Sequence, residues 1–179
     1  MSQKNLFFEG SAHVPLLIMP PQGRSLPQNI SVEAPTDLVD LYPTILAMAG
    51  LSSPVSVSGR NLLEPVPMDR IFFGNSLNRN FCVMEEKLKL VYSAVGDHVL
   101  LFDLNTDPME QHNLAEDPAW QERKAKLWKL LLEHTAQYTP EALDENGQFL
   151  TYEAPHFPGD VPGRWFGFHY HDYSVDTFH

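Results

Sequence analysis

Four short runs of residues between positions 70 and 104 constrain the fold more than any other feature of the sequence. The runs cover residues 70–76, 80–85, 87–93 and 98–104, and turn-like gaps separate them. In the third run the opening KLKL alternates charged with apolar residues, which is typical of a half-exposed antiparallel strand. The gap at 94–97 contains Gly96 and is short enough for a tight connection. Together the runs predict a four-stranded antiparallel meander.

An amphipathic helix is expected to follow this sheet. Asp117 can cap it, and Pro118 suits its first position. Apolar side chains recur at helical spacing, namely Trp120, Leu127, Trp128, Leu131 and Tyr138. A helix with such an apolar face needs a partner, and the meander is the available one.

The first third of the chain has a different character. Residues 13–21 form a short apolar run that ends in two prolines, and this predicts a buried strand. Residues 37–50 predict a helix with Asp40 as its cap, Pro43 in its first turn and Gly50 at its end. Its expected buried face consists of Leu41, Ile45, Met48 and Ala49.

These elements predict an α+β chain with three segments. Residues 1–67 would be the strand-plus-helix end of an α/β core, and residues 68–138 the four-stranded antiparallel sheet with its covering C-terminal helix. Residues 139–179 form an aromatic-rich tail, which we expect to wrap across the domain or onto a partner.

Charge and composition exclude several classes of function. The chain has 12 Lys and Arg against 23 Asp and Glu, a formal net charge of −11, which argues against binding to nucleic acid or to an anionic membrane surface. The apolar run at 14–21 is too short to span a bilayer, and the N-terminus shows no signal-peptide pattern. Cys82, the single cysteine, excludes an internal disulfide and a multi-cysteine zinc site, but it assigns no compartment.

Four stretches in order resemble the C-terminal portion of sulfatases of the alkaline-phosphatase superfamily. They are residues 4–16 (KNLFFEGSAHVPL), 39–51 (VDLYPTILAMAGL), 58–63 (SGRNLL) and 101–115 (LFDLNTDPMEQHNLA). The last is similar to the family ending Leu-Tyr-Asp-Leu-x-x-Asp-Pro-x-Glu-x-x-Asn-Leu. Independently of this resemblance, Asp107 and Pro108 predict a turn, and Glu110 and Asn113 can cap backbone groups before the last helix.

The resemblance implies hydrolysis of sulfate esters by an intact enzyme that uses a formylglycine nucleophile and a divalent metal, usually calcium. The Cys/Ser-x-Pro-Ser-Arg motif that yields formylglycine is missing here, and so is an Asp-rich metal site. The chain is therefore expected to be an inactive fragment whose partner is the missing N-terminal sulfatase domain, with no catalytic residue and no metal ligand of its own. One functional residue is implied: Lys4 matches the lysine that contacts the sulfate group in this family.

Other reactive side chains have simpler interpretations. His13, where many sulfatases have Arg, is expected at a strand entrance with one backbone hydrogen bond. Cys82 has apolar neighbours and is expected to be a buried small residue. The remaining candidates are the paired carboxylates Glu85, Glu86, Asp103 and Asp107, which are expected at turns and edges, and His169, His171, Asp172 and His179, which could bind a transition metal or simply pack. Stacking of a sugar is an option for Trp165, whereas Trp120 fits the core better.

Two other functions stay open at this point. The chain could be a non-catalytic interaction module, or a fragment of a phosphonate or phosphate monoester hydrolase, which shares the same C-terminal layout. The strand at 14–19 would have an open edge in this chain, so dimers or disorder are expected around residues 1–35.

Overall fold

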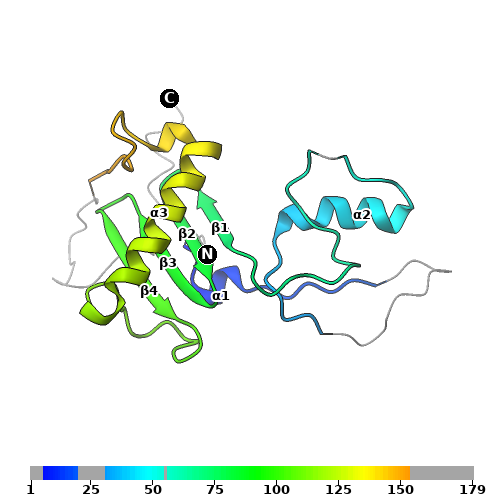
Figure 1. Cartoon of the computed structure of the whole chain (residues 1–179), viewed down its shortest axis with the longest axis horizontal. Coiled ribbons are helices and arrows are strands. Elements are labelled where there is room, and N and C mark those ends of the chain that lie inside the picture. Colours follow the sequence, from blue (N-terminus) through cyan, green and yellow to red (C-terminus); the bar gives the residue numbers. More distant parts are fainter. Residues whose placement is uncertain (1–5, 20–30, 55, 154–179) are drawn as a thin grey trace, which may run out of the picture. The chain divides into compact units, whose positions relative to one another are not determined.

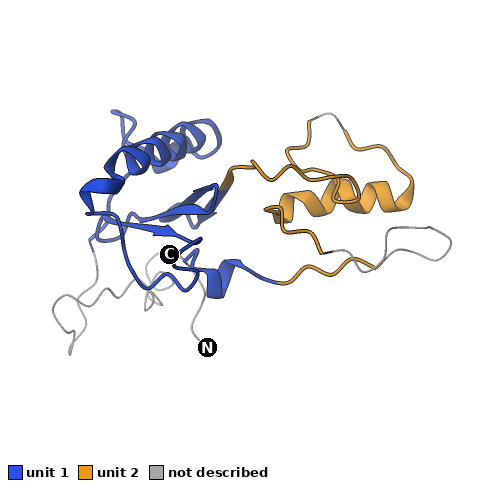
Figure 2. Ribbon diagram, turned by 60° about the horizontal axis from the view of Figure 1, so that its bottom comes forward, with its two compact units in different colours: residues 1–14, 73–179 blue, residues 15–72 orange. Residues whose placement is uncertain are grey.

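Regular structure is concentrated in two compact units of the chain (Figure 2). The computed structural model describes residues 6–19, 31–54 and 56–153. One unit joins residues 1–14 to residues 73–179, and the other consists of residues 15–72. The first unit thus combines two stretches that are far apart in the sequence.

The predicted meander is confirmed (Figure 1). Its strands are β1 (Phe72–Ser76), β2 (Asn80–Glu85), β3 (Leu88–Ser93) and β4 (His98–Asp103). They neighbour one another in chain order, and β3 pairs antiparallel with both β2 and β4. The tight connection between β3 and β4 places Gly96 and Asp97 in the left-handed region, at φ 77° and 54°. A glycine suits such a position because it has no Cβ to clash with the backbone.

The predicted covering helix is also present. Asp117 accepts a hydrogen bond from the Ala119 N–H at 2.9 Å and begins a short 3₁₀ turn, η2 (Pro118–Trp120), which continues into α3 (Gln121–Tyr138). Leu127, Leu131 and Thr135 form the buried face of α3, which packs on β2 and β3.

The residues at the two ends of the predicted apolar stripe, Trp120 and Tyr138, are not on the buried face of α3. Trp120 lies in the 3₁₀ turn that precedes α3, and the guanidinium of Arg123 stacks over its ring at 5.1 Å. Tyr138 is more than half exposed because it lies in the last turn, beside His134, with the ring centroids 4.6 Å apart. The buried part of the stripe is therefore shorter than the periodicity predicts.

Aromatic rings fill the space between α3 and the sheet. Tyr92 of β3 meets Trp128 of α3 edge to face at a centroid distance of 4.9 Å. Phe149 comes from the segment after α3, and its ring lies 4.5 Å from Phe81 and 4.7 Å from Tyr92. The chain then runs beside the sheet, where the Tyr152 N–H donates to the Ala94 carbonyl at 2.8 Å. Residues 154–179, which include most of the predicted aromatic tail, lie outside the described residues.

The unit of residues 15–72 contains one 3₁₀ turn, η1 (Leu38–Asp40), and one α-helix, α2 (Leu41–Ala49), among its described residues. Gly50 ends α2 at φ 77°, as predicted. Asp40 stands at the N-cap position of α2, as predicted, but its side chain makes no capping bond there, and the Asp37 carboxylate caps η1. Asp40 instead accepts the Arg60 N–H at 2.8 Å and pairs with the Arg70 guanidinium. Burial alone would raise the pKa of Asp40, but the bond to Arg70 and the backbone donors hold it below its ordinary value.

The strand predicted over residues 14–19 is not formed in this structure. A strand needs a neighbour to satisfy its backbone N–H and C=O groups, and the sheet of the described residues ends at β1 and β4. The side chains of Leu17 and Met19 are 90% and 85% exposed. The expected buried face of α2 is also partly open, because Ile45 and Ala49 are exposed. No helix of the described residues is long and apolar enough to cross a membrane.

Truncation of Leu131 tests the packing of α3. The side chain is fully buried, so Leu131→Ala is expected to lower the free energy of unfolding by about 2–5 kcal/mol, through lost burial and a residual cavity. The exposed Met109 provides a control. Met109→Ala is expected to change the free energy of unfolding by no more than about 0.5 kcal/mol. Urea unfolding followed by tryptophan fluorescence measures both, and equal losses would contradict this packing.

Candidate functional site

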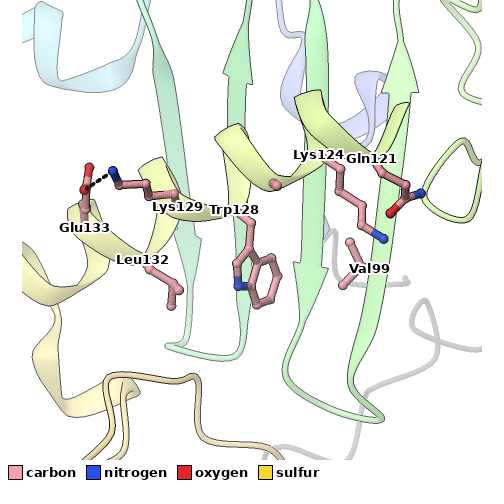
Figure 3. Close-up of a pocket in the computed structure, with 8 residues that line it drawn as sticks. Val99, Gln121, Lys124, Trp128, Lys129, Leu132 and Glu133 are labelled. Atoms are coloured by element: carbon pink, nitrogen blue, oxygen red, sulfur yellow. Dashed lines mark ion pairs between the residues drawn. The ribbon is translucent and has the colours of Figure 1, made fainter. Parts of the chain in front are cut away.

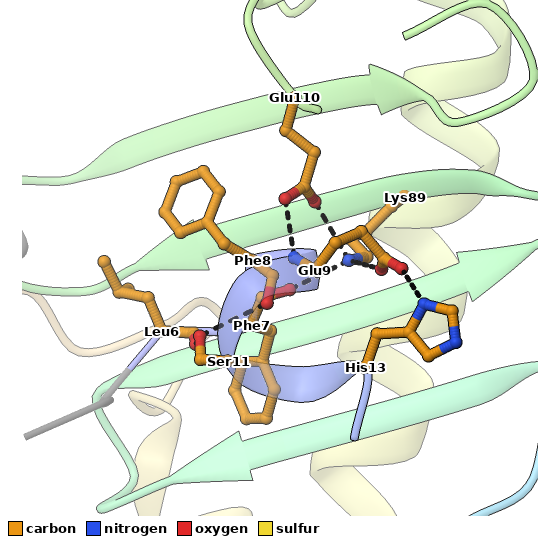
Figure 4. Close-up of polar contacts among 8 residues, drawn as sticks. All are labelled: Leu6, Phe7, Phe8, Glu9, Ser11, His13, Lys89 and Glu110. Atoms are coloured by element: carbon orange, nitrogen blue, oxygen red, sulfur yellow. Dashed lines mark hydrogen bonds and ion pairs between the residues drawn. The ribbon is translucent and has the colours of Figure 1, made fainter. Parts of the chain in front are cut away.

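The candidate site is the segment that directly follows Lys4. Lys4 itself, the one site residue predicted from the sequence, lies outside the described residues, which begin at Leu6. Residues 6–13 cross the sheet on the face opposite α3 (Figure 4). Side chains alternate along a strand, so in β3 Tyr92 faces α3 whereas Lys89 faces this segment.

Apolar contacts hold the segment against the sheet. Leu6 is buried, and the ring of Phe8 packs against Phe102 of β4 at a centroid distance of 5.9 Å. The ring of Phe7 lies over Gly74 of β1 so closely that a Cβ at that position would come within 2.5 Å of it. The chain then turns into α1 (Glu9–Ala12), and the Ser11 hydroxyl donates back to the Leu6 carbonyl at 2.6 Å.

A buried ion cluster joins this segment to the sheet and to a distant loop. The Lys89 ammonium donates to the Phe7 carbonyl and to Glu110 Oε1, both at 2.9 Å, and it pairs with the Glu9 carboxylate. These contacts use all three of its N–H donors. Glu110 Oε2 accepts the Glu9 backbone N–H at 2.6 Å, which closes the network. We call Glu9, Lys89 and Glu110 the Lys89 cluster.

Lys89 keeps its charge although its side chain is shielded from water. The side chains of Lys89 and Glu110 are only 2% and 3% exposed. Burial by itself lowers the pKa of Lys89, but the hydrogen bonds to Glu9 and Glu110 outweigh this effect and raise the pKa above its ordinary value. Lys89 is therefore an ammonium at neutral pH. At the edge of the cluster the exposed His13 places Nδ1 2.9 Å from Glu9 Oε2.

Three expectations from the sequence are corrected here. β3 is buried on both faces, not half-exposed, because residues 6–12 cover the face that alternation assigns to solvent. Glu110 caps the Glu9 N–H, 101 positions away, and not a group near the last helix. His13 stands at the end of α1, where its N–H donates to the Glu9 carbonyl at 3.0 Å, and not at a strand entrance. No local spacing in the sequence indicates the long-range contacts of Glu110 and Lys89 with residues 6–12.

The loop that carries Glu110 is itself organised by short side chains. Asn113 Oδ1 accepts the Leu101 N–H at 2.9 Å and the Ala115 N–H at 3.0 Å, which confirms its predicted capping role. The Asp107 carboxylate accepts the His112 N–H at 2.8 Å. The bond to Asp107 and the two bonds to Asn113 fix the loop between β4 and η2.

The remaining candidates give no reactive group. Cys82 is completely buried, as predicted, and burial raises the pKa of its thiol to about 12, so it is not a ready nucleophile. Glu85 pairs with Lys126, and Asp103 accepts from Asn105, so these carboxylates do not converge. The described residues contain no group of three or more His, Cys, Asp or Glu that could hold a metal ion. His169, His171, Asp172, His179 and Trp165 lie outside the described residues.

A groove of about 490 Å³ runs along α3 beside β4 (Figure 3). Trp128 and Val99 supply apolar surface, and Lys124 and Lys129 lie at its sides. The Lys124 ammonium already donates to the Ala115 carbonyl at 2.6 Å, and Lys129 lies 3.8 Å from Glu133. The groove thus offers an apolar surface, and the two lysine ammonium groups beside it already have partners.

Comparison with known proteins identifies the relatives of this chain. It is 34% identical over 131 residues to arylsulfatase K of Bos taurus, covering 63% of this chain and 24% of the relative. It is 35% identical over 150 residues to the choline-sulfatase of Rhizobium meliloti, covering 77% of this chain and 28% of that relative. A solved phosphonate monoester hydrolase of Agrobacterium radiobacter is 25% identical at a TM-score of 0.47, over 65% of this chain and 29% of that one. No protein-family model matches the chain.

Arylsulfatase K and the choline-sulfatase place the chain in the alkaline-phosphatase superfamily. Within it the chain belongs to the sulfatase family and corresponds to the C-terminal portion of a sulfatase. It spans about a quarter of the length of the curated relatives that it matches. The resemblance seen in the sequence is thereby confirmed.

Removal of the Lys89 ammonium tests the buried cluster. Lys89→Met is expected to lower the free energy of unfolding by about 3–5 kcal/mol, because it leaves two carboxylates near each other without their counter-ion. Lys126→Met breaks the more exposed pair with Glu85 and is expected to cost at most about 1 kcal/mol. Chemical denaturation of both variants measures the difference, and a Lys89→Met protein as stable as the Lys126→Met control would refute the cluster.

Alkaline pH provides a second test, through Cys82. An unfolded thiol loses its proton near pH 8.5, whereas folded Cys82 keeps it to about pH 12. The unfolded state therefore binds fewer protons in this window, and stability is expected to fall as the pH rises above about 8.5. Cys82→Ala should flatten this slope between about pH 8.5 and 10, below the titration of lysine and tyrosine. Denaturant unfolding of the unmodified protein and of Cys82→Ala across this pH range measures the two slopes. Equal slopes of the free energy of unfolding against pH would contradict the burial of the thiol.

Proposed function

We propose that the complete protein containing this chain hydrolyses sulfate esters, and that this chain supplies its C-terminal part. The observation that carries the proposal is the similarity to arylsulfatase K and choline-sulfatase over 131 and 150 residues. In such a reaction the bond between sulfur and the ester oxygen breaks, and the overall products are the alcohol and sulfate.

Exposed apolar side chains support the presence of an upstream domain. Leu17, Met19, Tyr42 and Ile45 are all largely exposed in the unit of residues 15–72. Large apolar side chains exposed in this number are typical of a surface that another part of the protein covers. We infer that residues 1–67 complete a large α/β domain, where residues 14–19 gain strand neighbours. Residues 68–138 then form the small sheet domain, and residues 139–179 wrap around it.

The reactive centre is assigned to the upstream domain. The described residues offer no set of ligands for a divalent cation, and Cys82 is buried outside any formylglycine motif. These residues do not fit the nucleophile and the metal that sulfatases use, so neither is placed on them. The contribution proposed for this chain is Lys4, whose ammonium would contact the sulfate group and offset charge on the leaving oxygen.

Turnover of an aryl sulfate by the complete protein tests this function. We expect release of 4-nitrophenol from 4-nitrophenyl sulfate, and a loss of about 10²-fold in kcat for Lys4→Ala, typical of a lost transition-state contact. Lys129→Ala, which removes an exposed lysine on α3, should keep full activity. Residues 1–179 alone should be inactive.

Three outcomes would contradict the proposal. Turnover by residues 1–179 alone, above that of their Lys4→Ala variant, would show that the chain is not a fragment. Faster turnover of a 4-nitrophenyl phosphonate ester would favour a phosphonate hydrolase. No turnover of either ester would favour an interaction module, and self-association of the chain through residues 14–19 would then identify its partner as a second copy.

A further inference from the structure

We propose that Asn146 is a site of spontaneous deamidation, a covalent modification that needs only water and converts the side-chain amide to a carboxylate. Asn146 is the one asparagine of the sequence that a glycine follows. Asparagine is one of the thermolabile residues of proteins, and a glycine after it leaves the backbone free to bend toward its side chain. Both Asn146 and Gly147 are exposed in the turn at residues 144–148.

The reaction joins the backbone nitrogen of Gly147 to the side chain of Asn146. The nitrogen loses its proton to a solvent base and attacks Cγ, so that an N–Cγ bond forms, the Cγ–Nδ2 bond breaks and Nδ2 leaves as ammonia. Water then opens the cyclic imide at Cγ, which gives aspartate, or at the main-chain carbonyl, which gives isoaspartate. In sum, an amide and water become a carboxylic acid and ammonia, with no oxidation or reduction.

The described residues contain a second turn with matching hydrogen bonds, at Asn105. In each turn an aspartate lies two positions before the asparagine. The Asn146 N–H donates to Asp144 Oδ1 at 2.9 Å, and the Asn105 N–H donates to Asp103 Oδ1 at 3.1 Å. The N–H of the residue after the asparagine donates to the carbonyl of the same aspartate, at 3.0 Å in the first turn and 3.1 Å in the second. Both asparagines are exposed, so Asn105 is a natural control for Asn146.

The two turns differ in the residue whose nitrogen must attack. Gly147 has no side chain, and a Cβ built there would meet no other described residue within 4 Å, its chain neighbours aside. Thr106 is β-branched, so two heavy atoms on its Cβ crowd the same approach. The hydrogen bond of the attacking N–H slows both turns alike, because it is present in both. We therefore expect Asn146 to react and Asn105 to stay intact.

The modification changes a turn that places a core ring. Asn146 Nδ2 lies 3.5 Å from Asp144 Oδ2. Hydrogen bonds from the Gln148 and Asn146 N–H groups hold the pKa of Asp144 below its ordinary value, so a new carboxylate at 146 would lie beside a second negative charge. Phe149 follows this turn and packs 4.5 Å from Phe81. Deamidation is therefore expected to loosen residues 143–150.

Peptide mapping of aged protein tests the reaction. The full chain is kept at mildly alkaline pH in water enriched in heavy oxygen, and its peptides are then analysed by mass spectrometry. We expect residue 146 to gain the mass of an exchange of NH2 for OH, with oxygen taken from the solvent, and residue 105 to stay unchanged. The reaction should be slower at mildly acidic pH, because less of the attacking nitrogen is deprotonated.

Two reciprocal substitutions separate the effect of the glycine from that of the turn. Gly147→Ala is expected to slow the modification of Asn146 several-fold, because a Cβ then hinders the attack. Thr106→Gly should make Asn105 react at a rate similar to that of Asn146. Gly147 has a φ of 72°, at which alanine is strained, so the second substitution keeps the test decisive if the first protein does not fold.

Three results would overturn this inference. They are an unchanged residue 146 in the folded protein, equal rates at residues 105 and 146, and a folded Thr106→Gly protein in which Asn105 stays intact. Amide hydrogen exchange measures the structural effect. Exchange at residues 143–150 should be faster in the modified molecules, and equal exchange before and after modification would refute the loosening of the turn.

Discussion

The rest of the structure depends on one buried ammonium, that of Lys89. Its side chain lies on a strand that is covered on both faces, and it is neutralised by carboxylates from two distant parts of the chain. Without Glu9 and Glu110 a charge at this position would be excluded from the interior by its desolvation cost. With these two carboxylates in place, residues 6–13 cover one face of the sheet and α3 covers the other (Figure 4).

β3 connects these two layers. On one face Tyr92 packs against Trp128 and Phe149, and three residues earlier Lys89 binds the N-terminal segment on the other face. The strand is rigid in its hydrogen-bonded register with β2 and β4. The α3 layer and the layer of residues 6–13 therefore both pack on the same strand, β3.

The sequence predicts the elements whose signals are local. The strand β3, the Asp117 cap and the Gly50 terminus each depend on a few neighbouring residues, and the structure contains all three. The alternation predicts wrongly that Lys89 is exposed, because a polar residue in the pattern does not indicate what covers its side chain. The covering segment contains Glu9, which lies 80 positions away in the sequence. The run at 14–19 has the composition of a strand, but composition does not supply the neighbour that a strand requires.

The same cluster joins two separate stretches of the sequence that resemble sulfatases. Glu9 belongs to the stretch at 4–16 and Glu110 to the stretch at 101–115, and Lys89 binds both in one network. Among the described residues, neither stretch forms a group of three or more His, Cys, Asp or Glu that could hold a metal ion. Their shared property is that each supplies one carboxylate to the buried lysine. The cluster thus joins the two stretches into one scaffold that holds residues 6–13 against the sheet.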